Sequence, residues 1–145
     1  MSDVPNVQAD IIGQLQTLLA GVPGFGAEIR EDNVLDLIDA EDEELPDQLI
    51  VLQEGDTSEL DRSGATVREE LTINIVAMTR LRDHAQPLRT ARLDIKRALK
   101  GIKAGFTVDG LIKVAFPTSA PRYPDRGRRW AFRVIPITVT YVQQL

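Results

Sequence analysis

The sequence predicts an α+β fold: a mostly antiparallel or mixed β-sheet of four to five strands, with two α-helices packed on one face. Three observations predict it. The chain has 145 residues, 43% of them hydrophobic, which suits one domain with a real core spanning residues 1–145. Two segments well apart in the chain show the three- and four-residue spacing of amphipathic helices. Other segments alternate as half-buried strands do, and the mixed order of helices and strands is typical of α+β proteins.

The first predicted element is an amphipathic helix over residues 7–20. Its apolar residues form one stripe, and Gly21 and Pro23 supply the stop signal. Residues 29–38 follow, in which apolar residues are scattered among acids, and we expect one strand with a bend there. Residues 40–47 (AEDEELPD) are expected to form an acidic loop that ends in a proline turn.

A hairpin is predicted in the middle of the chain. Residues 48–53 (QLIVLQ) have the composition of a short buried strand. The next segment, EGDTSELDRSGAT, is rich in Gly, Ser, Thr and Asp, which predicts a mobile loop. Residues 68–80 then alternate between apolar and polar side chains, which indicates a strand with one face on a core.

The second helix is predicted over residues 85–102. Its apolar stripe runs from Leu88 to Ile102, and arginines and lysines lie outside or along its flanks. Gly101 and Gly105 are expected to end it. A strand over residues 111–116 follows.

The closing strand is predicted over residues 130–143. Pro136 lies inside it and has no amide hydrogen to donate, so we expect it on a sheet edge or at a bulge. Trp130, Phe132 and Val134 alternate with the residues of the core face. We therefore expect them on the opposite sheet face, partly covered by a loop.

Charge is divided unevenly along the chain. Residues 28–70 carry 16 acidic and 3 basic residues, net −13, whereas residues 80–133 carry 14 basic and 4 acidic residues, net +10. Solubility alone does not need this division. The division suggests complementary surfaces that meet in a head-to-tail assembly. The alternative is two separate solvated faces, or pairing within one subunit.

The sequence offers little for an enzyme, and we predict no enzymatic activity. It has no cysteine, which excludes disulfides and thiolate chemistry, and its only histidine, His84, lies in a polar turn where a surface or capping role is favoured. The adjacent acids of residues 41–44 lack the spacing and the glycine of a calcium loop. The glycine-containing segments match neither a phosphate loop nor a dinucleotide fingerprint. We therefore expect no cofactor and no bound metal.

Membrane and nucleic-acid roles are also disfavoured. There is no apolar run long enough to span a membrane, and the first residues lack the layout of a signal peptide, so we expect synthesis in the cytoplasm. Direct DNA binding has some support from the basic second helix and from residues 122–133, but the total charge is −5 and no known DNA-binding pattern is present. The proline-rich segment 117–130 is instead predicted to be a stiff protein-contact loop, with a plain hairpin connection as the alternative.

Several segments together resemble a known family. They are LLAGVPGF at residues 18–25, LIVL at 49–52, RxELTINI at 68–75, ALKG at 98–101, GLIKV at 110–114 and WAFRVIPITVTY at 130–141. In this order they resemble the tail terminator, or tail completion, proteins of long-tailed bacteriophages. The likeness runs from Ile11 to Tyr141 and depends on element order more than on an invariant motif. Compared with the short chains usual in that family, the acidic segment and the loop at 117–129 look long.

The resemblance implies a structural virion protein at the head-proximal end of a tail. Such subunits form a six-fold ring that caps the tail tube, stops its polymerisation and offers the surface that joins the head. Partners would be further copies of the chain, the tail tube protein, a head-tail connector or neck protein, and a sheath protein if the tail is contractile. DNA would pass through the lumen without specific binding, past a wall to which some of the acids contribute.

Two sets of residues are candidate contacts. We expect an acidic set on one subunit to oppose a basic set on its neighbour, and the 117–130 loop to touch the tube or the neck. The acidic set is Asp36, Asp39, Glu41, Asp42, Glu43, Glu44 and Asp47, and the basic set is Arg89, Arg92, Lys96 and Lys100. The loop set is Arg122, Tyr123, Arg126, Arg128, Arg129 and Trp130. The alternatives are a head-tail connector or neck protein, or a small cytoplasmic module that binds protein or nucleic acid.

Overall fold

The computed structural model describes residues 4–40, 44–117, 120–122 and 129–145. It is an α+β fold built on a mixed sheet, as the sequence predicts. The sheet order is β1-β2-β3-β6-β4, with β5 beside β6; β1 is parallel to β2 and the other pairs are antiparallel. In chain order the elements are α1 (Val7–Leu19), β1 (Ile29–Glu31), α2 (Val34–Ala40), β2 (Gln48–Ser63), β3 (Thr66–Thr79), α3 (Ala85–Ala98), β4 (Leu111–Ala115), β5 (Ala120–Arg122) and β6 (Ala131–Gln144).

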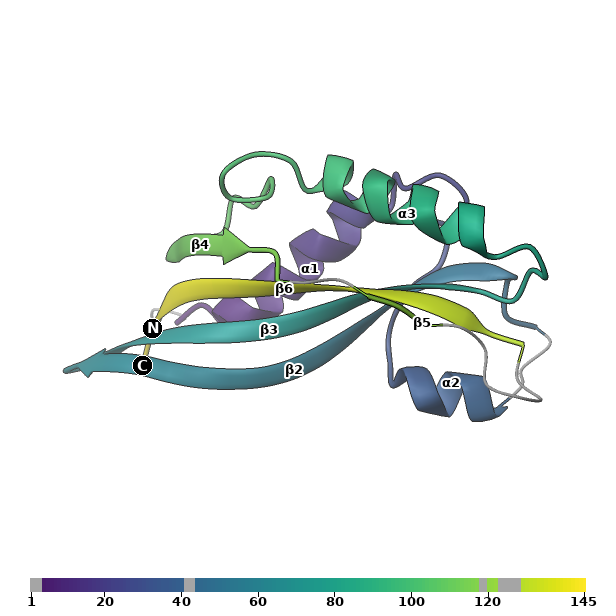
Figure 1. Ribbon diagram of the computed structural model, residues 1–145. Coiled ribbons are helices and arrows are strands. Elements are labelled where there is room, and N and C mark those ends of the chain that lie inside the picture. Colours follow the sequence, from purple (N-terminus) through teal and green to yellow (C-terminus); the bar gives the residue numbers. More distant parts are fainter. Residues whose placement is uncertain (1–3, 41–43, 118–119, 123–128) are drawn as a thin grey trace.

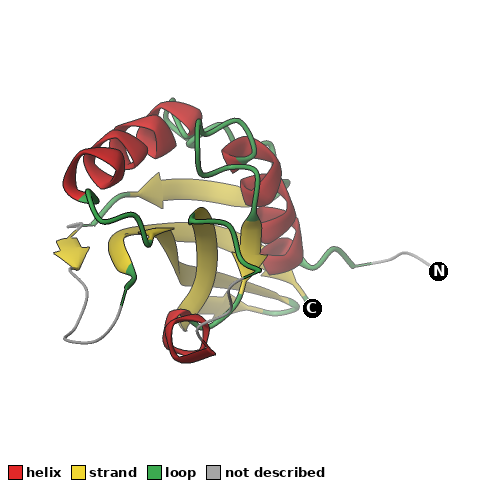
Figure 2. Cartoon of the chain, turned by 90° about the vertical axis from the view of Figure 1, so that its right-hand side faces the viewer, coloured by secondary structure: helices red, strands yellow, loops and turns green. Residues whose placement is uncertain are grey.

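The helices lie on both faces of the sheet. Helices α1 and α3 cover one face, and α2 lies against the other (Figures 1 and 2). A core forms on each side because successive strand residues point to opposite faces. The larger core joins α1 and α3 to the sheet, and the smaller one joins α2 to residues of β2, β3 and β6. We call the two faces the α1/α3 face and the α2 face.

Helix α1 is confirmed almost to the residue. Asn6 accepts a hydrogen bond from the Ala9 amide through its side chain at 3.1 Å, which caps the first turn. The predicted apolar stripe is buried and packs on the sheet. The closing turn needs Gly26, because a Cβ there would lie 2.5 Å from the Leu19 carbonyl oxygen.

The expected bent strand over residues 29–38 is wrong in its second half. Only Ile29–Glu31 forms a strand, and Val34–Ala40 is the helix α2. Asn33 starts the helix, because its side-chain oxygen accepts from the amides of Leu35 at 2.9 Å and Asp36 at 3.4 Å. Val34, Leu37 and Ile38 have helical spacing and are buried against the sheet. The fold thus has α2 on the opposite face of the sheet, in addition to the two helices predicted on one face.

The expected mobile loop after residue 53 is also wrong. Strand β2 continues to Ser63, and β3 begins at Thr66, so the segment is a long hairpin with a turn at Gly64 (φ +60°). The β2–β3 register shifts twice, between Glu54 and Thr57 and between Glu59 and Asp61. Exposed polar residues adopt strand structure here because β3 pairs with β2 on one side and with β6 along its whole length on the other.

Helix α3 is confirmed but shorter than predicted. Leu88, Ala91 and Ile95 are buried, and Leu99 closes the helix. The expectation that Ile102 packs inward is wrong, because its exposed fraction is 95%. Gly101 adopts a φ of +105°, which turns the chain before Ile102 and takes this side chain out of the stripe.

The closing strand confirms two expectations. On the side of β6 away from β3, Phe132–Val134 pair with β5 and Thr138–Tyr141 pair with β4. Pro136 lies between these described pairs, so on that side β6 is an edge at this residue. Trp130 is buried on the α2 face, and Phe132 and Val134 pack against the same core. Helix α2 provides the cover that was expected from a loop.

Candidate assembly surfaces

The two predicted charged surfaces lie on opposite faces of the sheet. On the α2 face, the described acidic residues are Asp36, Asp39, Glu44 and Asp47, and all four are exposed. On the α1/α3 face, Arg89 and Lys100 are exposed and Arg92 and Lys96 are half-buried on or just after α3. We call these sets the acidic surface and the basic surface. Glu41, Asp42 and Glu43 lie outside the described residues.

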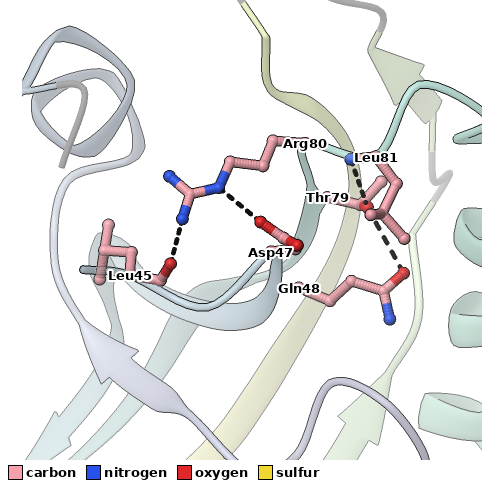
Figure 3. A network of polar contacts seen from close by, with 6 residues as sticks. All are labelled: Leu45, Asp47, Gln48, Thr79, Arg80 and Leu81. Carbon is pink, nitrogen blue, oxygen red and sulfur yellow. Dashed lines mark hydrogen bonds and ion pairs between the residues drawn. The ribbon is translucent and has the colours of Figure 1, made fainter. Parts of the chain in front are cut away.

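Arg80 holds the chain of the acidic surface in place (Figure 3). Its Nε donates to Asp47 Oδ1 at 2.9 Å, and its guanidinium also donates to the Leu45 carbonyl oxygen. The Arg80 side chain is only 6% exposed and its guanidinium carbon lies 5.0 Å from the centre of the Trp130 ring. Asp47 is therefore already paired within the subunit.

Thr79 and Gln48 complete this network. The Thr79 hydroxyl donates to Gln48 Oε1 at 3.4 Å and accepts from the Leu81 amide at 3.2 Å (Figure 3). Thr79 is the one fully buried polar residue in the described part of the chain. Its hydroxyl is satisfied on both sides, so the end of β3 is fixed where the chain leaves for α3.

The basic surface is built on a regular helix. Arg89 Nη1 donates to Gln86 Oε1 at 2.8 Å, and Lys96 Nζ lies 5.5 Å from the centre of the Phe116 ring. Arg97 forms an ion pair with Asp94 at 3.4 Å. Lys96 and Arg97 are in the last turn, where positive charge interacts favourably with the helix dipole. The helix therefore sets the backbone positions of these cations.

The predicted contact loop is only partly described. The backbone of Arg122 belongs to β5 and pairs with Phe132. Arg129 is exposed. Trp130 is 3% exposed and belongs to the core of the α2 face, which removes its side chain from the list of contact residues. Tyr123, Arg126 and Arg128 lie outside the described residues.

Sequence reasoning missed an apolar pocket beside α2. The pocket has a volume of about 170 Å³ and is lined by Val34, Leu35, Gln53, Asn74, Val76, Phe132 and Val134. Gln53 Oε1 accepts from the Val34 amide at 3.1 Å, so the start of α2 is tied to β2 at this point. The helical spacing of Val34, Leu37 and Ile38 was the available signal, because it buries those three and leaves Leu35 at the rim.

The described residues lack a metal-binding cluster, and one tyrosine among them has a shifted pKa. They include no cluster of three or more histidines or acids able to hold a metal. Burial raises the pKa of Tyr141 to about 12, and its hydroxyl donates to Glu69 at 3.1 Å and accepts from Gln8 at 2.7 Å. This phenol stays protonated near neutral pH and ties α1 to the sheet. In the same part of the chain, every helix is too short or too polar to cross a membrane.

The fold is shared with a virion component. The chain is similar to a solved structure of the virion of a native gene transfer agent particle, with a TM-score of 0.53 and 14% identity over 94% of this chain and 91% of that chain. At this identity the similarity shows the fold. No family model matches the sequence, and no curated protein matches it either.

Proposed function

We propose that this chain is a structural protein of a phage-like virion, a tail terminator whose copies associate head to tail into a ring on the end of a tail tube. The observation that carries the proposal is that α2 and α3 lie on opposite faces of the sheet (Figure 1), because α2 and the residues after it carry the acidic surface and α3 carries the basic surface. Opposite surfaces of unlike charge favour a heterologous contact, and such a contact closes into a ring when its rotation is right. The fold similarity to a component of a gene transfer agent virion supports the broader part of the proposal, a structural protein of a phage-like virion.

The contact is predicted to be electrostatic at its rim. Asp36 and Asp39 on one subunit face Arg89, Lys96 and Lys100 on the next. Salt weakens such contacts, because the Debye length falls from about 10 Å at 0.1 M to about 3 Å at 1 M. The ring would cap the tube, and its outer side would meet the head-tail connector, or a sheath protein in a contractile tail.

The experiment is a capping assay with the tail tube protein from the same virion. Tube protein is polymerised with and without this chain, and tube lengths and ends are measured by electron microscopy. We expect ring-shaped caps and arrested growth. A double variant, Arg89→Glu with Lys100→Glu, should cap poorly, while Arg62→Glu with Arg68→Glu on the β2–β3 hairpin is the matched control.

The neck protein is the related alternative, and the same assay separates it. Protein that leaves tube ends uncapped and binds the portal side of the head would replace the terminator assignment by a connector. Protein that ignores both and shifts DNA with a steep dependence on salt would support the binding module instead.

A further inference from the structure

Ile102 is an unusual surface residue. Among the described large apolar side chains it is the most exposed, at 95%, and Leu35 is second at 66%. The turn that carries Ile102 is ordered, because the Ala104 amide donates to the Gly101 carbonyl at 3.1 Å and Lys103 Nζ donates to the Leu111 carbonyl at 3.3 Å. The chain therefore presents one branched apolar side chain on a fixed turn, between Lys100 and Lys103. A single exposed apolar residue is common, so this observation needs a second one.

The second observation is the pocket beside α2, on the opposite side of the sheet. Half-buried Phe132 and Val134 line it, and so does Leu35, which is exposed. A cavity of roughly 150 Å³ accepts a benzene-sized molecule, so about 170 Å³ suits one branched aliphatic side chain. Asp32 and Asp36, both exposed, flank α2 residues of the pocket in the sequence.

We propose that Ile102 of one copy inserts into the α2 pocket of a second copy, with Lys100 and Lys103 opposite Asp32 and Asp36. The inference rests on the proposed head-to-tail assembly and names the apolar centre of its contact. An apolar centre inside a polar rim is the usual anatomy of an interface. Charge complementarity favours a second copy as the occupant. In the sequence Ile102 lies between two lysines, and the pocket residues Val34 and Leu35 lie between two exposed aspartates.

The contact is heterologous by construction. Helices α3 and α2 lie on opposite faces of the sheet (Figure 1). Ile102 follows α3 in the chain and the pocket is lined by residues of α2, so one copy would use the two sites with two different neighbours. Fully burying an isoleucine side chain corresponds to roughly a ten- to hundredfold gain in association constant. The variant Ile102→Ser should lose about this much, and it should fold normally because the side chain is exposed.

Cysteine cross-linking tests the pairing directly, since the chain has no cysteine of its own. Two single variants, I102C and L35C, are purified and mixed under mild oxidation. We expect a disulfide-linked dimer from the mixture and none from either variant alone. The matched control replaces L35C by L60C, a 46% exposed leucine on the β2–β3 hairpin, and should give no dimer with I102C. A chain carrying both cysteines, I102C and L35C, should give a ladder of linked species.

The outcomes separate this inference from the proposed function. Rings that form without cross-linking above the L60C control would overturn the Ile102 contact and leave the assembly proposal standing. Self-linking of I102C alone would show a symmetric contact and overturn the inference. A chain that stays monomeric at every concentration would overturn both. Ile102→Ser should raise the concentration needed for assembly, with Leu60→Ser as its control.

Discussion

Arg80 is predicted to be the main polar support of the α2 face, and Arg80→Ala measures its contribution. The substitution removes at least three interactions: the cation–π contact with Trp130, the hydrogen bond to the Leu45 carbonyl, and the ion pair with Asp47. A cation on an aromatic ring contributes about 1 kcal/mol, and a hydrogen bond from a charged donor about 1.5–3 kcal/mol. The ion pair contributes less than about 1 kcal/mol, because Asp47 is 62% exposed. The expected loss is about 3 kcal/mol.

Urea unfolding followed by circular dichroism checks this value. With a slope of about 2 kcal/mol per molar urea, the midpoint should fall by roughly 1.5 M. Arg82→Ala is the matched control, because Arg82 is an exposed arginine two residues further on and should change stability by less than about 0.5 kcal/mol. Arg80→Lys should lie between wild type and Arg80→Ala. Equal midpoints for Arg80→Ala and Arg82→Ala would show that the contacts of the Arg80 side chain do not stabilise the fold.

Three further predictions concern the fold. Gly26→Ala should destabilise the fold, because the added Cβ would lie 2.5 Å from the Leu19 carbonyl oxygen, whereas Gly13→Ala has open space in α1 and should stabilise the fold by about 0.5–1 kcal/mol. Melting temperatures of the two variants check this, and equal shifts from wild type would contradict it. Asn33→Ala should lower the free energy of unfolding by about 1 kcal/mol, because the cap of α2 is lost, and urea unfolding measures this. An unchanged free energy of unfolding would show that packing alone determines where the helix starts. Tyr141 has a pKa above that of an unfolded tyrosine, so it stabilises the fold below pH 10, and this contribution disappears as the pH rises toward 12. The melting temperature should therefore fall more between pH 8 and pH 11 for wild type than for Tyr141→Phe, and equal falls for the two proteins would contradict this.

The parts of the fold that depend on local periodicity were predictable. Helices α1 and α3 have one apolar stripe each, and the stripe of each packs on the sheet. The error at Ile102 came from extending the stripe past Gly101, whose positive φ redirects the chain. In α2 the acids masked a short helical pattern, although Asn33 before Val34 was a capping signal.

The hairpin and the site depended on information that is not local. The polar residues after Gln53 have loop composition, and only pairing of β3 with both β2 and β6 makes the segment a strand. Periodicity does not specify which sheet face the short helix α2 covers, so the opposite placement of the acidic and basic surfaces came only from the structure. The pocket beside α2 was missed for the same reason, since its walls come from segments as distant as Val34 and Val134.

We expect the acidic and basic surfaces, on opposite faces of the sheet, to make this chain associate head to tail. The most direct measurement is the native mass of the purified protein by light scattering, across concentration and salt. We expect a mass that rises from 16.1 kDa toward that of a six-fold ring, about 97 kDa or six times 16.1 kDa, and that falls again near 1 M salt. A mass of 16.1 kDa at every concentration in low salt, or an assembly indifferent to salt, would contradict it.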